Sequence, residues 1–395
     1  MNTNQNRIVA ISGNKSAAMG AALSRPDLIA AYPITPQSSV VESLAQMIAQ
    51  GDLNSTMIQV ESEHSAMSVV QGAAVAGGRT FTATSAQGLA LMYEPYFRMS
   101  TLRLPMVMAI ATREMTSPET VWSGQQDAVS VRDAGWIQVY VENNQEILDM
   151  IIQGYKIAEH PDVLLPVNVC YDGFYLSHLT ERVEIPHQPA VDDFLGVYHA
   201  DHVSLDPDTP MAVDPLTSGE ILWRYRKGHL DAMQKALQVI EQTDDAFEQV
   251  FGRRYGGVID TYKMDDADFV IVTMGATTGT AREAVDVARS LGMKIGLLKV
   301  RFLRPFPDKK IREILSGKQG FVVIDKNVCF GWNTGVLYME IKAAISELGH
   351  PISSMPAIGG LGGADISVDQ LVTCIQVLVK QGSQQPGQLD TYWFQ

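Results

Sequence analysis

Apolar residues in the first half of the chain gather in short runs of strand length, and stretches with helical spacing separate these runs. The strand-length runs cover residues 7–12, 28–32, 55–60, 80–84, 105–112, 137–141 and 163–169. The helical stretches cover residues 15–23, 38–49, 65–75 and 145–159. Strands that alternate with helices imply parallel βαβ units. We therefore predict a doubly wound α/β domain with a parallel sheet over residues 1–185.

The second half begins with a proline-rich, acidic segment and then returns to the same alternation. Residues 186–217 lack periodicity, which predicts an extended connector, and residues 218–251 have the spacing of one long amphipathic helix or a pair of helices. The later strands cover 269–274, 294–298 and 321–325, the later helices cover 280–291, 309–315, 333–348 and 368–380, and loops are expected at 302–306 and 358–364. We predict a linker with a long helix over 186–260, a second doubly wound domain over 261–385, and a C-terminal arm over 386–395.

Composition and charge narrow the class of protein. The 395 residues are 46% hydrophobic and 19% charged, as in ordinary globular proteins, and the net charge of −14 argues against nucleic-acid binding. The three cysteines, Cys170, Cys329 and Cys374, are far apart and form no CxxC pair, so we expect no zinc or iron–sulfur ligand set and no metal site in this chain. The N-terminus lacks a signal-peptide core and no apolar run is long enough to span a bilayer, so we expect a cytoplasmic protein without a membrane span.

One carboxylate, Glu63, lies where the strand over 55–60 gives way to the helix over 65–75. Ligand clefts in open α/β sheets form at such strand ends. A buried carboxyl group there can share a proton with a ring nitrogen of a ligand and perform general acid/base chemistry. A plain structural role fits as well, because Glu61 and Glu63 near a helix N-terminus interact favourably with the helix dipole. The sequence does not show whether Glu63 is buried.

Three further stretches follow predicted strands. Residues 32–36, Tyr-Pro-Ile-Thr-Pro, form a rigid loop in which two prolines fix the backbone around Thr35. Residues 85–88 form a turn that opens a helix and leaves backbone N–H groups free. Arg113 begins a long loop over 113–126, and a guanidinium there can grip a carboxylate bidentately. Thr35 as a turn residue and Arg113 as a surface arginine are the plain alternatives.

Residues 31–36, Ala-Tyr-Pro-Ile-Thr-Pro, followed by 61–64, Glu-Ser-Glu-His, resemble the α chain of 2-oxoacid:ferredoxin oxidoreductases, which depend on thiamine diphosphate. Other stretches agree in order and spacing, and they are 13–14, 82–88, 112–113, 126–127, 172–178 and 268–307. The resemblance covers nearly the whole sequence. It implies a thiamine pyrimidine-binding domain followed by a transketolase C-terminal-like domain.

The resemblance also implies roles for individual residues. Glu63 would hydrogen-bond to the aminopyrimidine of thiamine diphosphate and favour the imino tautomer that takes the C2 proton. Thr35 would bond to the keto or carboxylate oxygen of a 2-oxoacid, and Arg113 would pair with its carboxylate. The expected cofactor contacts are Pro33, Gln87 and Gly88, the last two through backbone N–H groups.

An absence points to partner chains. Thiamine enzymes hold the diphosphate and Mg²⁺ with a Gly-Asp-Gly motif and a later asparagine, and Tyr171-Asp172-Gly173 is the nearest approach here. We therefore expect other subunits to complete the site. The resemblance implies that a β chain holds the diphosphate and Mg²⁺, with [4Fe–4S] clusters in partner chains only. Smaller γ- and δ-type chains would bind coenzyme A and further clusters. The final acceptor would be ferredoxin, or NAD through a flavin subunit.

The reaction implied by the resemblance is oxidative decarboxylation of a 2-oxoacid with transfer of the acyl group to coenzyme A. Pyruvate is the default substrate, but the loop over 114–122 carries the large apolar residues Met115 and Trp122, which favours a bulky or aryl acid such as phenylglyoxylate. Two other functions stay open, a non-catalytic subunit that kept the fold and half of a transketolase-like enzyme. A periplasmic binding protein is disfavoured because no export signal is present. The sequence leaves open the substrate side chain, the final acceptor, and the number and stoichiometry of partner subunits.

Overall fold

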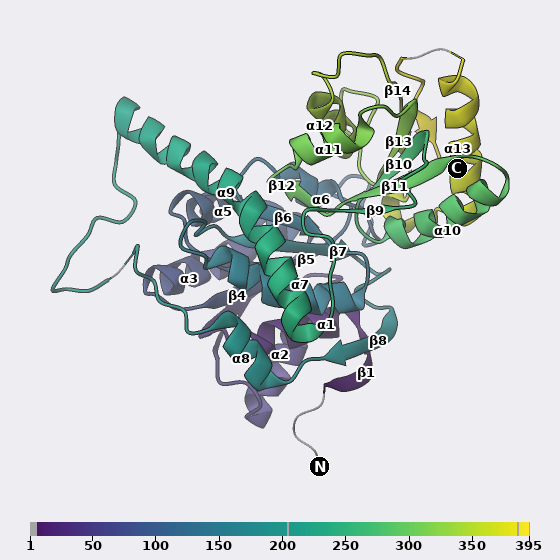
Figure 1. Ribbon diagram of the computed structural model, residues 1–395. Coiled ribbons are helices and arrows are strands. Elements are labelled where there is room, and N and C mark those ends of the chain that lie inside the picture. The colour runs from purple at the N-terminus through teal and green to yellow at the C-terminus, as the bar shows by residue number, and fades with distance from the viewer. Residues whose placement is uncertain (1–5, 204, 385–386, 395) are drawn as a thin grey trace.

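The first of two large sheets contains seven strands. The structure is a computed structural model that describes residues 6–203, 205–384 and 387–394 (Figure 1). The strand order is β12-β6-β7-β5-β4-β2-β3 (Figure 1). The bounds are β2 (Leu28–Ala31), β3 (Thr56–Gln59), β4 (Thr80–Thr84), β5 (Val107–Thr112), β6 (Ile137–Tyr140), β7 (Val167–Asp172) and β12 (Phe302–Arg304). All neighbours pair in parallel except β12, which runs antiparallel to β6. The predicted α/β class with a parallel sheet is confirmed.

Helices cover both faces of this sheet. Their bounds are α1 (Gly13–Leu23), α2 (Ser38–Gln50), α3 (Glu63–Val75), α4 (Ala86–Leu91), α5 (Tyr93–Thr101), α6 (Gln126–Ser130) and α7 (Asn144–Ala158). α1 packs against α2 and α7, whereas α3 packs against α4 and α5. With helices on either side, the central strands β4, β5 and β7 are buried along their whole length, as parallel strands usually are.

The second sheet has six strands in the order β15-β14-β13-β10-β11-β9. Its strands are β9 (Ile259–Tyr262), β10 (Phe269–Thr273), β11 (Ile295–Val300), β13 (Gly320–Asp325), β14 (Ser353–Ile358) and β15 (Tyr392–Trp393). Its helices are α10 (Thr277–Ser290), α11 (Asp308–Leu315), α12 (Val336–Ala344), the 3₁₀ turn η1 (Leu361–Gly363) and α13 (Val368–Gly382). Only β9 runs antiparallel to its neighbour, so this sheet is also doubly wound and mostly parallel.

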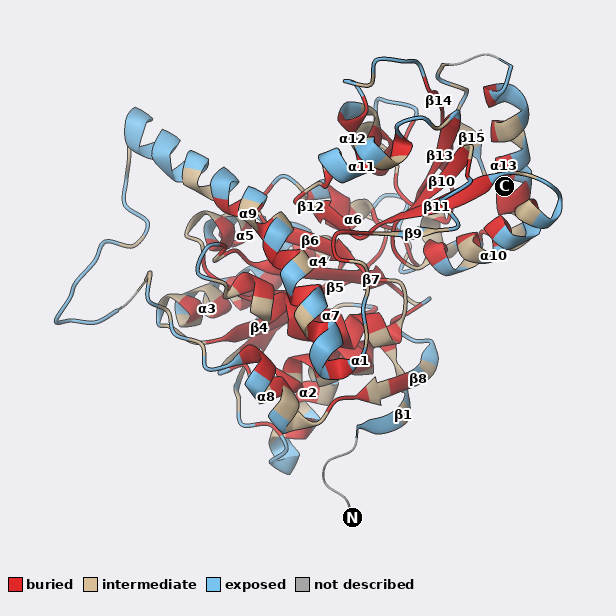
Figure 2. Cartoon of the chain, in the orientation of Figure 1, coloured by how far each residue is buried: buried red, intermediate tan, exposed pale blue. Residues whose placement is uncertain are grey.

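Four elements lie outside the two sheets. β1 (Arg7–Ser12) and β8 (Thr180–Ile185) pair as a separate antiparallel ribbon, followed by α8 (Gln188–Leu195). α9 (Gly219–Phe251) is a single helix of 33 residues. Its C-terminal half packs on α7, and its N-terminal half extends away from the body of the molecule and is exposed (Figures 1 and 2).

Prolines account for some of the differences from the predicted elements, and β8, β9, α6 and β15, which contain none, were also not predicted. α8 forms within the segment predicted to be extended, because Pro189 occupies the first helical turn, where its missing N–H costs nothing. The predicted loop over 302–306 contains β12, which ends directly before Pro305. β14 was not predicted and contains Pro356. β7 begins at Val167 instead of residue 163, since Leu164 has a positive φ of 48° in a turn.

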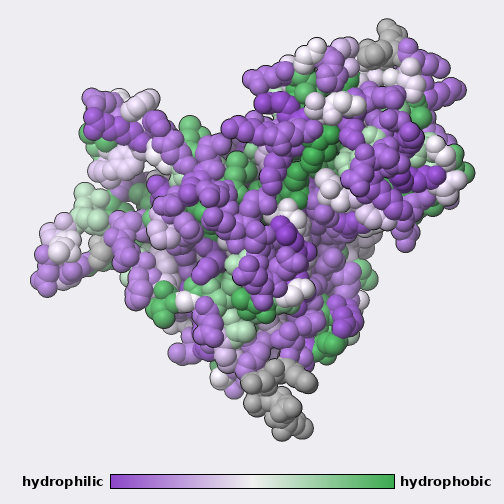
Figure 3. Space-filling view, viewed as in Figure 1, coloured by the Kyte–Doolittle hydropathy of each residue, from purple (hydrophilic) through white to green (hydrophobic). Residues whose placement is uncertain are grey.

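The predicted C-terminal arm lies against the second sheet. β15 pairs with β14, and the Phe394 N–H donates to the Ile358 carbonyl at 3.0 Å. The polar exterior agrees with the composition, because hydrophilic residues predominate on the face shown in Figure 3. Within the described ranges, no helix combines the length and apolar character needed to cross a bilayer.

Candidate active site

Four neighbouring strands deliver the predicted site residues to one edge of the first sheet. Thr35 follows β2, Glu63 follows β3, Gln87 and Gly88 follow β4, and Arg113 follows β5. The carboxyl ends of these strands lie side by side because the strand order is β3-β2-β4-β5. The chain leaves β2 toward β3 and returns on the other side at β4, so the topological switch point lies between β2 and β4.

The Glu63 side chain is buried at the first position of α3. Ser62 caps the helix, since its hydroxyl accepts a hydrogen bond from the Ser65 N–H at 3.2 Å. Glu63 is 4% exposed, and burial raises the pKa of its carboxyl group, opposed by a backbone hydrogen bond. Among the described residues, no other side chain hydrogen-bonds or forms an ion pair with this carboxyl group. A buried acid without a protein partner is suited to bond with a ligand.

Gly88 makes room for the Glu63 carboxyl group. A Cβ atom at Gly88 would lie 2.7 Å from Glu63 Oε1 and 2.5 Å from Thr84 Oγ1. Both separations are too short for real contacts. The first turn of α4 therefore packs directly against the carboxyl group, and only glycine fits there.

The Arg113 guanidinium is almost fully buried and joins two of the neighbouring loops. Its Nη1 donates to the Thr35 carbonyl at 2.7 Å, and its Nη2 donates to Gln87 Oε1 at 2.8 Å. Glu119 Oε1 lies 3.8 Å from Nη2, and Nε is buried with no hydrogen-bond partner. Burial lowers the pKa of Arg113, and Asp127 and Glu119 oppose this effect. The arginine thus fixes the relative position of the β2 and β4 loops.

Three of the predicted contact residues, Thr35, Gln87 and Pro33, lie at the edge of this cluster, and their roles toward a ligand stay predictions. Thr35 is exposed, and its backbone carbonyl, not its hydroxyl, meets Arg113. The Gln87 side chain accepts a hydrogen bond from Arg113, and the expected contact of its backbone N–H with the cofactor stays a prediction. Pro33 is exposed in the same loop as Thr35. The site as built is a cluster of Glu63, Gly88, Gln87 and Arg113, with the Thr35 loop beside it.

Asp127 is a site residue that was not predicted. It is fully buried, and its Oδ2 accepts from the N–H groups of Ala86 at 2.9 Å and Arg113 at 3.1 Å. Its Oδ1 accepts from the Ala128 N–H at 2.7 Å. One carboxyl group therefore holds the starts of both loops that carry Gln87, Gly88 and Arg113. The only signal in the sequence was its place in the Gln126-Asp127 pair, which gave no role.

Carboxyl groups with raised pKa values gather at this edge. Burial raises the pKa of Asp127 to about 7, although its three N–H bonds and Arg113 oppose the shift. Burial and the nearby Asp127 raise the pKa of Glu114 to about 7. Together with Glu63, these are three acids held partly against ionisation. Such clustering is typical of functional sites.

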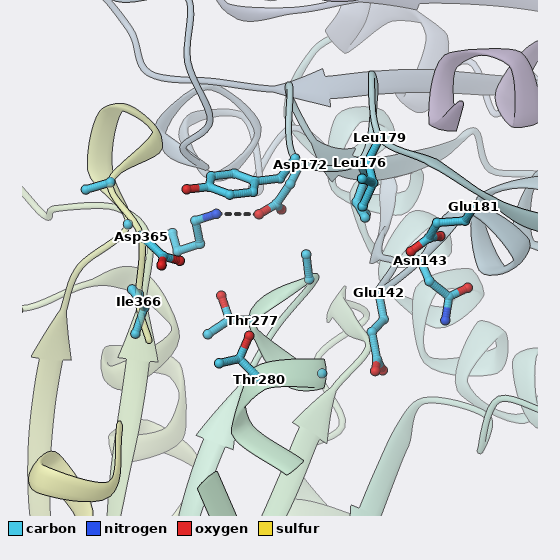
Figure 4. Close-up of a pocket in the computed structure, with 16 residues that line it drawn as sticks. Glu142, Asn143, Asp172, Leu176, Leu179, Glu181, Thr277, Thr280, Asp365 and Ile366 are labelled. Atoms are coloured by element: carbon cyan, nitrogen blue, oxygen red, sulfur yellow. Dashed lines mark hydrogen bonds and ion pairs between the residues drawn. The ribbon is translucent and has the colours of Figure 1, made fainter. Parts of the chain in front are cut away.

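A cavity of about 360 Å³ opens between the carboxyl edges of the two sheets, and Glu63, Gly88, Gln87 and Arg113 are not among the described residues that line it. Asp172 at the end of β7 lines one side, and Thr277 and Thr280 at the start of α10 face it (Figure 4). Lys326, which follows β13, pairs with Asp172 across the boundary. The described residues contain no group of three or more His, Cys, Asp or Glu side chains that is arranged to hold a metal ion.

Comparisons with known proteins identify the family. Residues 19–245 match the family described as "Pyruvate flavodoxin/ferredoxin oxidoreductase, thiamine diP-bdg", and residues 267–371 match "Pyruvate:ferredoxin oxidoreductase core domain II". The chain belongs to the 2-oxoacid:ferredoxin oxidoreductase family, as an alpha subunit. The resemblance inferred from the sequence is confirmed.

Two relatives show how similar the members of this family are to the chain. The NADH-dependent phenylglyoxylate dehydrogenase subunit alpha of Aromatoleum evansii is 49% identical, over 92% of this chain and 88% of the relative. Pyruvate synthase subunit PorA of Methanocaldococcus jannaschii is 46% identical, over 94% of each chain. Both relatives are named as subunits of oxidoreductases that act on 2-oxoacids.

Two solved structures support the fold. The 2-oxoglutarate:ferredoxin oxidoreductase from Magnetococcus marinus matches with a TM-score of 0.72 and 19% identity, covering 96% of this chain. This chain spans 66% of the length of that chain. A split-gene transketolase, described as an inactive beta4 tetramer, matches with a TM-score of 0.54 and 12% identity, over 94% of this chain and 99% of that one. At these identities the two structures bear on the fold alone.

Proposed function

We propose that this subunit supplies the cofactor-activating glutamate, Glu63, to a thiamine diphosphate-dependent oxidoreductase that converts a 2-oxoacid and coenzyme A to an acyl-coenzyme A, carbon dioxide and two electrons. The observation that carries the proposal is the buried Glu63 carboxyl group, which has a raised pKa and no side-chain partner among the described residues. It follows β3, the neighbour of the switch-point strand β2, in a domain whose family is described as thiamine-binding.

The residues at this edge fit such a cofactor. Gly88 keeps the space in front of Glu63 free of a side chain, and burial favours a carboxyl group that shares a proton with a ring nitrogen. When bound, thiamine diphosphate supplies the carbanion that attacks the keto carbon and the positive ring that accepts the electrons left by carbon dioxide. Glu63 would hold the aminopyrimidine, with Pro33, Gln87 and Gly88 lining the space around it.

Arg113 and Thr35 would orient the substrate. Nη1 and Nη2 of Arg113 each carry a second N–H besides the one that bonds to Thr35 or Gln87, so the guanidinium retains donors for the substrate carboxylate. The Thr35 carbonyl accepts a hydrogen bond from the same guanidinium. The Thr35 hydroxyl can therefore bond to a keto or carboxylate oxygen of the substrate. Holding both ends of a 2-oxoacid positions the keto carbon for attack.

We infer that other chains complete the site. This chain has no Gly-Asp-Gly motif for Mg²⁺ and diphosphate and no cysteine framework for clusters. A β chain would hold the diphosphate, Mg²⁺ and a [4Fe–4S] cluster, and γ- and δ-type chains would bind coenzyme A and further clusters. Electrons would pass to ferredoxin, or to NAD through a flavin subunit, in the cytoplasm.

The test replaces Glu63 in the purified native complex. Glu63→Gln keeps the shape of the side chain but weakens its exchange of a proton, so we expect turnover to fall about 10²-fold or more. Glu61→Gln is the matched control, because Glu61 is exposed and bonds to Ser65 on the same helix start. The control should keep turnover within about twofold of the wild type.

The same experiment, together with an assay for two-carbon transfer by the wild-type complex, decides between the proposal and its rivals. A non-catalytic subunit predicts that Glu63→Gln leaves turnover unchanged in an intact complex. A transketolase-like half predicts two-carbon transfer between sugars without any electron acceptor. Either result would overturn the proposed role of Glu63 in 2-oxoacid oxidation.

For the substrate, we propose a bulky or aryl 2-oxoacid such as phenylglyoxylate over pyruvate. Trp122 in the Arg113 loop stacks near Phe174 with ring centroids 4.4 Å apart, and Phe174 stacks on His178 at 4.7 Å. Gly173, directly before Phe174, approaches the Thr35 loop, since a Cβ there would lie 2.9 Å from Pro36 Cγ, and we infer that the rings form an aromatic wall on that side. An aromatic wall favours an aromatic side chain.

The substrate proposal predicts that kcat/KM for phenylglyoxylate exceeds that for pyruvate in the native complex, by about tenfold or more. Trp122→Ala should reduce kcat/KM for phenylglyoxylate more than for pyruvate. Equal or higher kcat/KM for pyruvate would show that the aromatic wall does not select the substrate.

A further inference from the structure

Nearly all residues assigned to the proposed site lie on the first sheet, and the second domain has so far no part in the chemistry. The second domain nevertheless holds the loop that begins at Arg113. The clearest contact is made by Lys326, which follows β13 of the second sheet and is 6% exposed. What this lysine does rests on the function proposed above.

Lys326 binds the Arg113 loop through both its backbone and its side chain. Its carbonyl accepts a hydrogen bond from the Gln125 N–H at 2.9 Å. Its Nζ donates to Ser123 Oγ at 3.0 Å and to Asp172 Oδ2. The dashed line that ends at Asp172 in Figure 4 marks this ion pair. The lysine therefore connects the end of β7, the end of the loop and the second sheet.

Ser123 connects Lys326 to Arg113. Ser123 is fully buried and forms an antiparallel β-bridge with Arg113, so the two ends of the loop lie side by side. The Ser123 carbonyl also accepts from the Gly363 N–H at 2.8 Å, which adds a second contact from the second domain. A third contact joins the Val328 N–H to Gln126 Oε1 at 3.0 Å.

The buried charges of Lys326 and Asp172 agree with a fixed position of the Arg113 loop. Asp172 is 1% exposed, and the cation that it meets is Lys326, whose ammonium group also lies 5.3 Å from the centre of the Tyr175 ring. Removing one member of a buried ion pair leaves the other uncompensated, so the pair resists small displacements. A loop anchored in this way keeps its arginine in one orientation.

We propose that Lys326 is a positioning residue for substrate binding, which holds the Arg113 guanidinium in register with the substrate carboxylate through Ser123. The second domain thus takes part in substrate recognition without touching the substrate. Displacing a substrate-positioning group by about 1 Å can cost up to about 10²-fold in efficiency.

The first experiment measures the kinetics of Lys326→Met in the native complex. We expect the KM for the 2-oxoacid to rise about tenfold or more, with the KM for coenzyme A within about twofold of the wild type. Lys326→Arg keeps the charge and should recover part of the loss. Lys318→Met is the matched control, because Lys318 precedes the other end of β13 and donates to the Met264 and Ala267 carbonyls.

Where Lys326→Met alone fails to assemble, Lys326→Met with Asp172→Asn removes both buried charges and restores balance. The expected rise in the 2-oxoacid KM is the same. A folded complex of either variant with the wild-type KM would overturn the proposal.

A second measurement does not depend on turnover. Arg113 is 3% exposed, so trypsin should not cut between Arg113 and Glu114 in the wild-type complex. Release of the loop in Lys326→Met should expose this bond, and mass spectrometry would detect the fragment that begins at Glu114. Protection equal to that of the wild type and of Lys318→Met would contradict a positioning role.

Failure of this inference is separable from failure of the proposed function. Arg113→Lys should raise the 2-oxoacid KM if Arg113 binds the substrate, and Arg113→Lys with Lys326→Met should be little worse than Arg113→Lys alone. If Arg113→Lys leaves the KM unchanged, the substrate role of Arg113 is wrong. If Arg113→Lys raises the KM but the two substitutions act additively, only the role of Lys326 is wrong.

Discussion

At the scale of residues, the proposed site depends on Gly88, which has no side chain. Gly88→Ala would place a methyl group 2.7 Å from Glu63 Oε1 and 2.5 Å from Thr84 Oγ1, so the carboxyl group or the α4 turn must shift. We expect Gly88→Ala to reduce turnover about tenfold or more in the native complex, since small displacements of positioned groups are costly.

The matched control is Gly72→Ala in the helix that carries Glu63. Gly72 is exposed in α3, and a Cβ there would meet no atom within 4 Å. Alanine is the better helix former, so this variant should gain about 0.5–1 kcal/mol in unfolding free energy and keep full turnover. Equal turnover of the two variants would show that the space at Gly88 is not needed.

The sequence was informative about which residues matter at this scale and less so about how they act. Glu63 could be singled out through the resemblance carried by residues 31–36 and 61–64, because a carboxylate at a strand-to-helix junction is by itself a weak signal that the helix dipole also explains. Its burial, and the bonds of Arg113 to Thr35 and Gln87, depend on strands β2, β4 and β5 being neighbours. That order is a property of the folded sheet, and no local pattern encodes it. Asp127 was missed for the same reason, since Ala86, which starts the β4 loop that it holds, lies 41 residues away in sequence.

At the scale of elements, one carboxylate fixes the end of the long helix α9. Asp244 is fully buried and accepts from the N–H groups of three successive residues, Tyr255, Gly256 and Gly257, at 2.8–3.2 Å. This turn leads directly into β9 of the second sheet. Asp244→Asn places an amide donor against backbone donors, so we expect a loss of about 2–3 kcal/mol in unfolding free energy.

Chemical denaturation would measure this loss, with Asp245→Asn as the control. Asp245 is exposed and pairs with Arg254 at 2.7 Å, a surface contact worth about 0–1 kcal/mol. A loss in Asp244→Asn no larger than that of the control would mean that the turn holds without its carboxylate.

Elements with clear periodicity were predicted well, and elements that contain or adjoin prolines were not. The alternation of apolar strands and amphipathic helices predicted both sheets, because burial on two faces demands continuous apolar strands. α8 and β14 each contain a proline, and β12 lies beside one. In a sequence pattern, a proline usually indicates the end of a helix or strand. In the fold, Pro189 occupies a helix start and Pro305 ends a short edge strand, so both positions tolerate the missing donor.

At the scale of the whole molecule, a buried carboxylate ties the two sheets together. Glu146 of α7 accepts from Lys299 Nζ at 2.8 Å and from Arg301 Nε at 2.9 Å, and Lys299 lies on β11. Burial alone would raise the pKa of Glu146, but Lys299 and Arg301 outweigh it and hold the pKa at about 2. The ordinary value is 4.5, so the ionised form stabilises the folded state fully above pH 4.5 and less as the pH falls toward 2.

Glu146→Gln should therefore cost about 3–5 kcal/mol in unfolding free energy at pH 7, because it leaves the buried Arg301 without its carboxylate and Lys299 with Glu142 alone. The difference from the wild type should shrink as the pH falls from 4.5 toward 2. Denaturation curves at several pH values would measure this convergence. Glu347→Gln removes an exposed partner of Arg312 and should change stability by less than about 1 kcal/mol at every pH. A constant difference across the range would exclude ionisation of Glu146 as the cause.

The position of β12 limits how a gene for this subunit can be divided or recombined. Strands β9 to β11 belong to the second sheet, the next strand β12 completes the edge of the first sheet, and β13 to β15 return to the second. No single break in the polypeptide, among the described strands, yields two pieces that each contain a whole sheet. A crossover between two related genes would build at least one sheet from both parents. The gene segments for the two sheet-containing domains are thus expected to be inherited together, as one unit of selection.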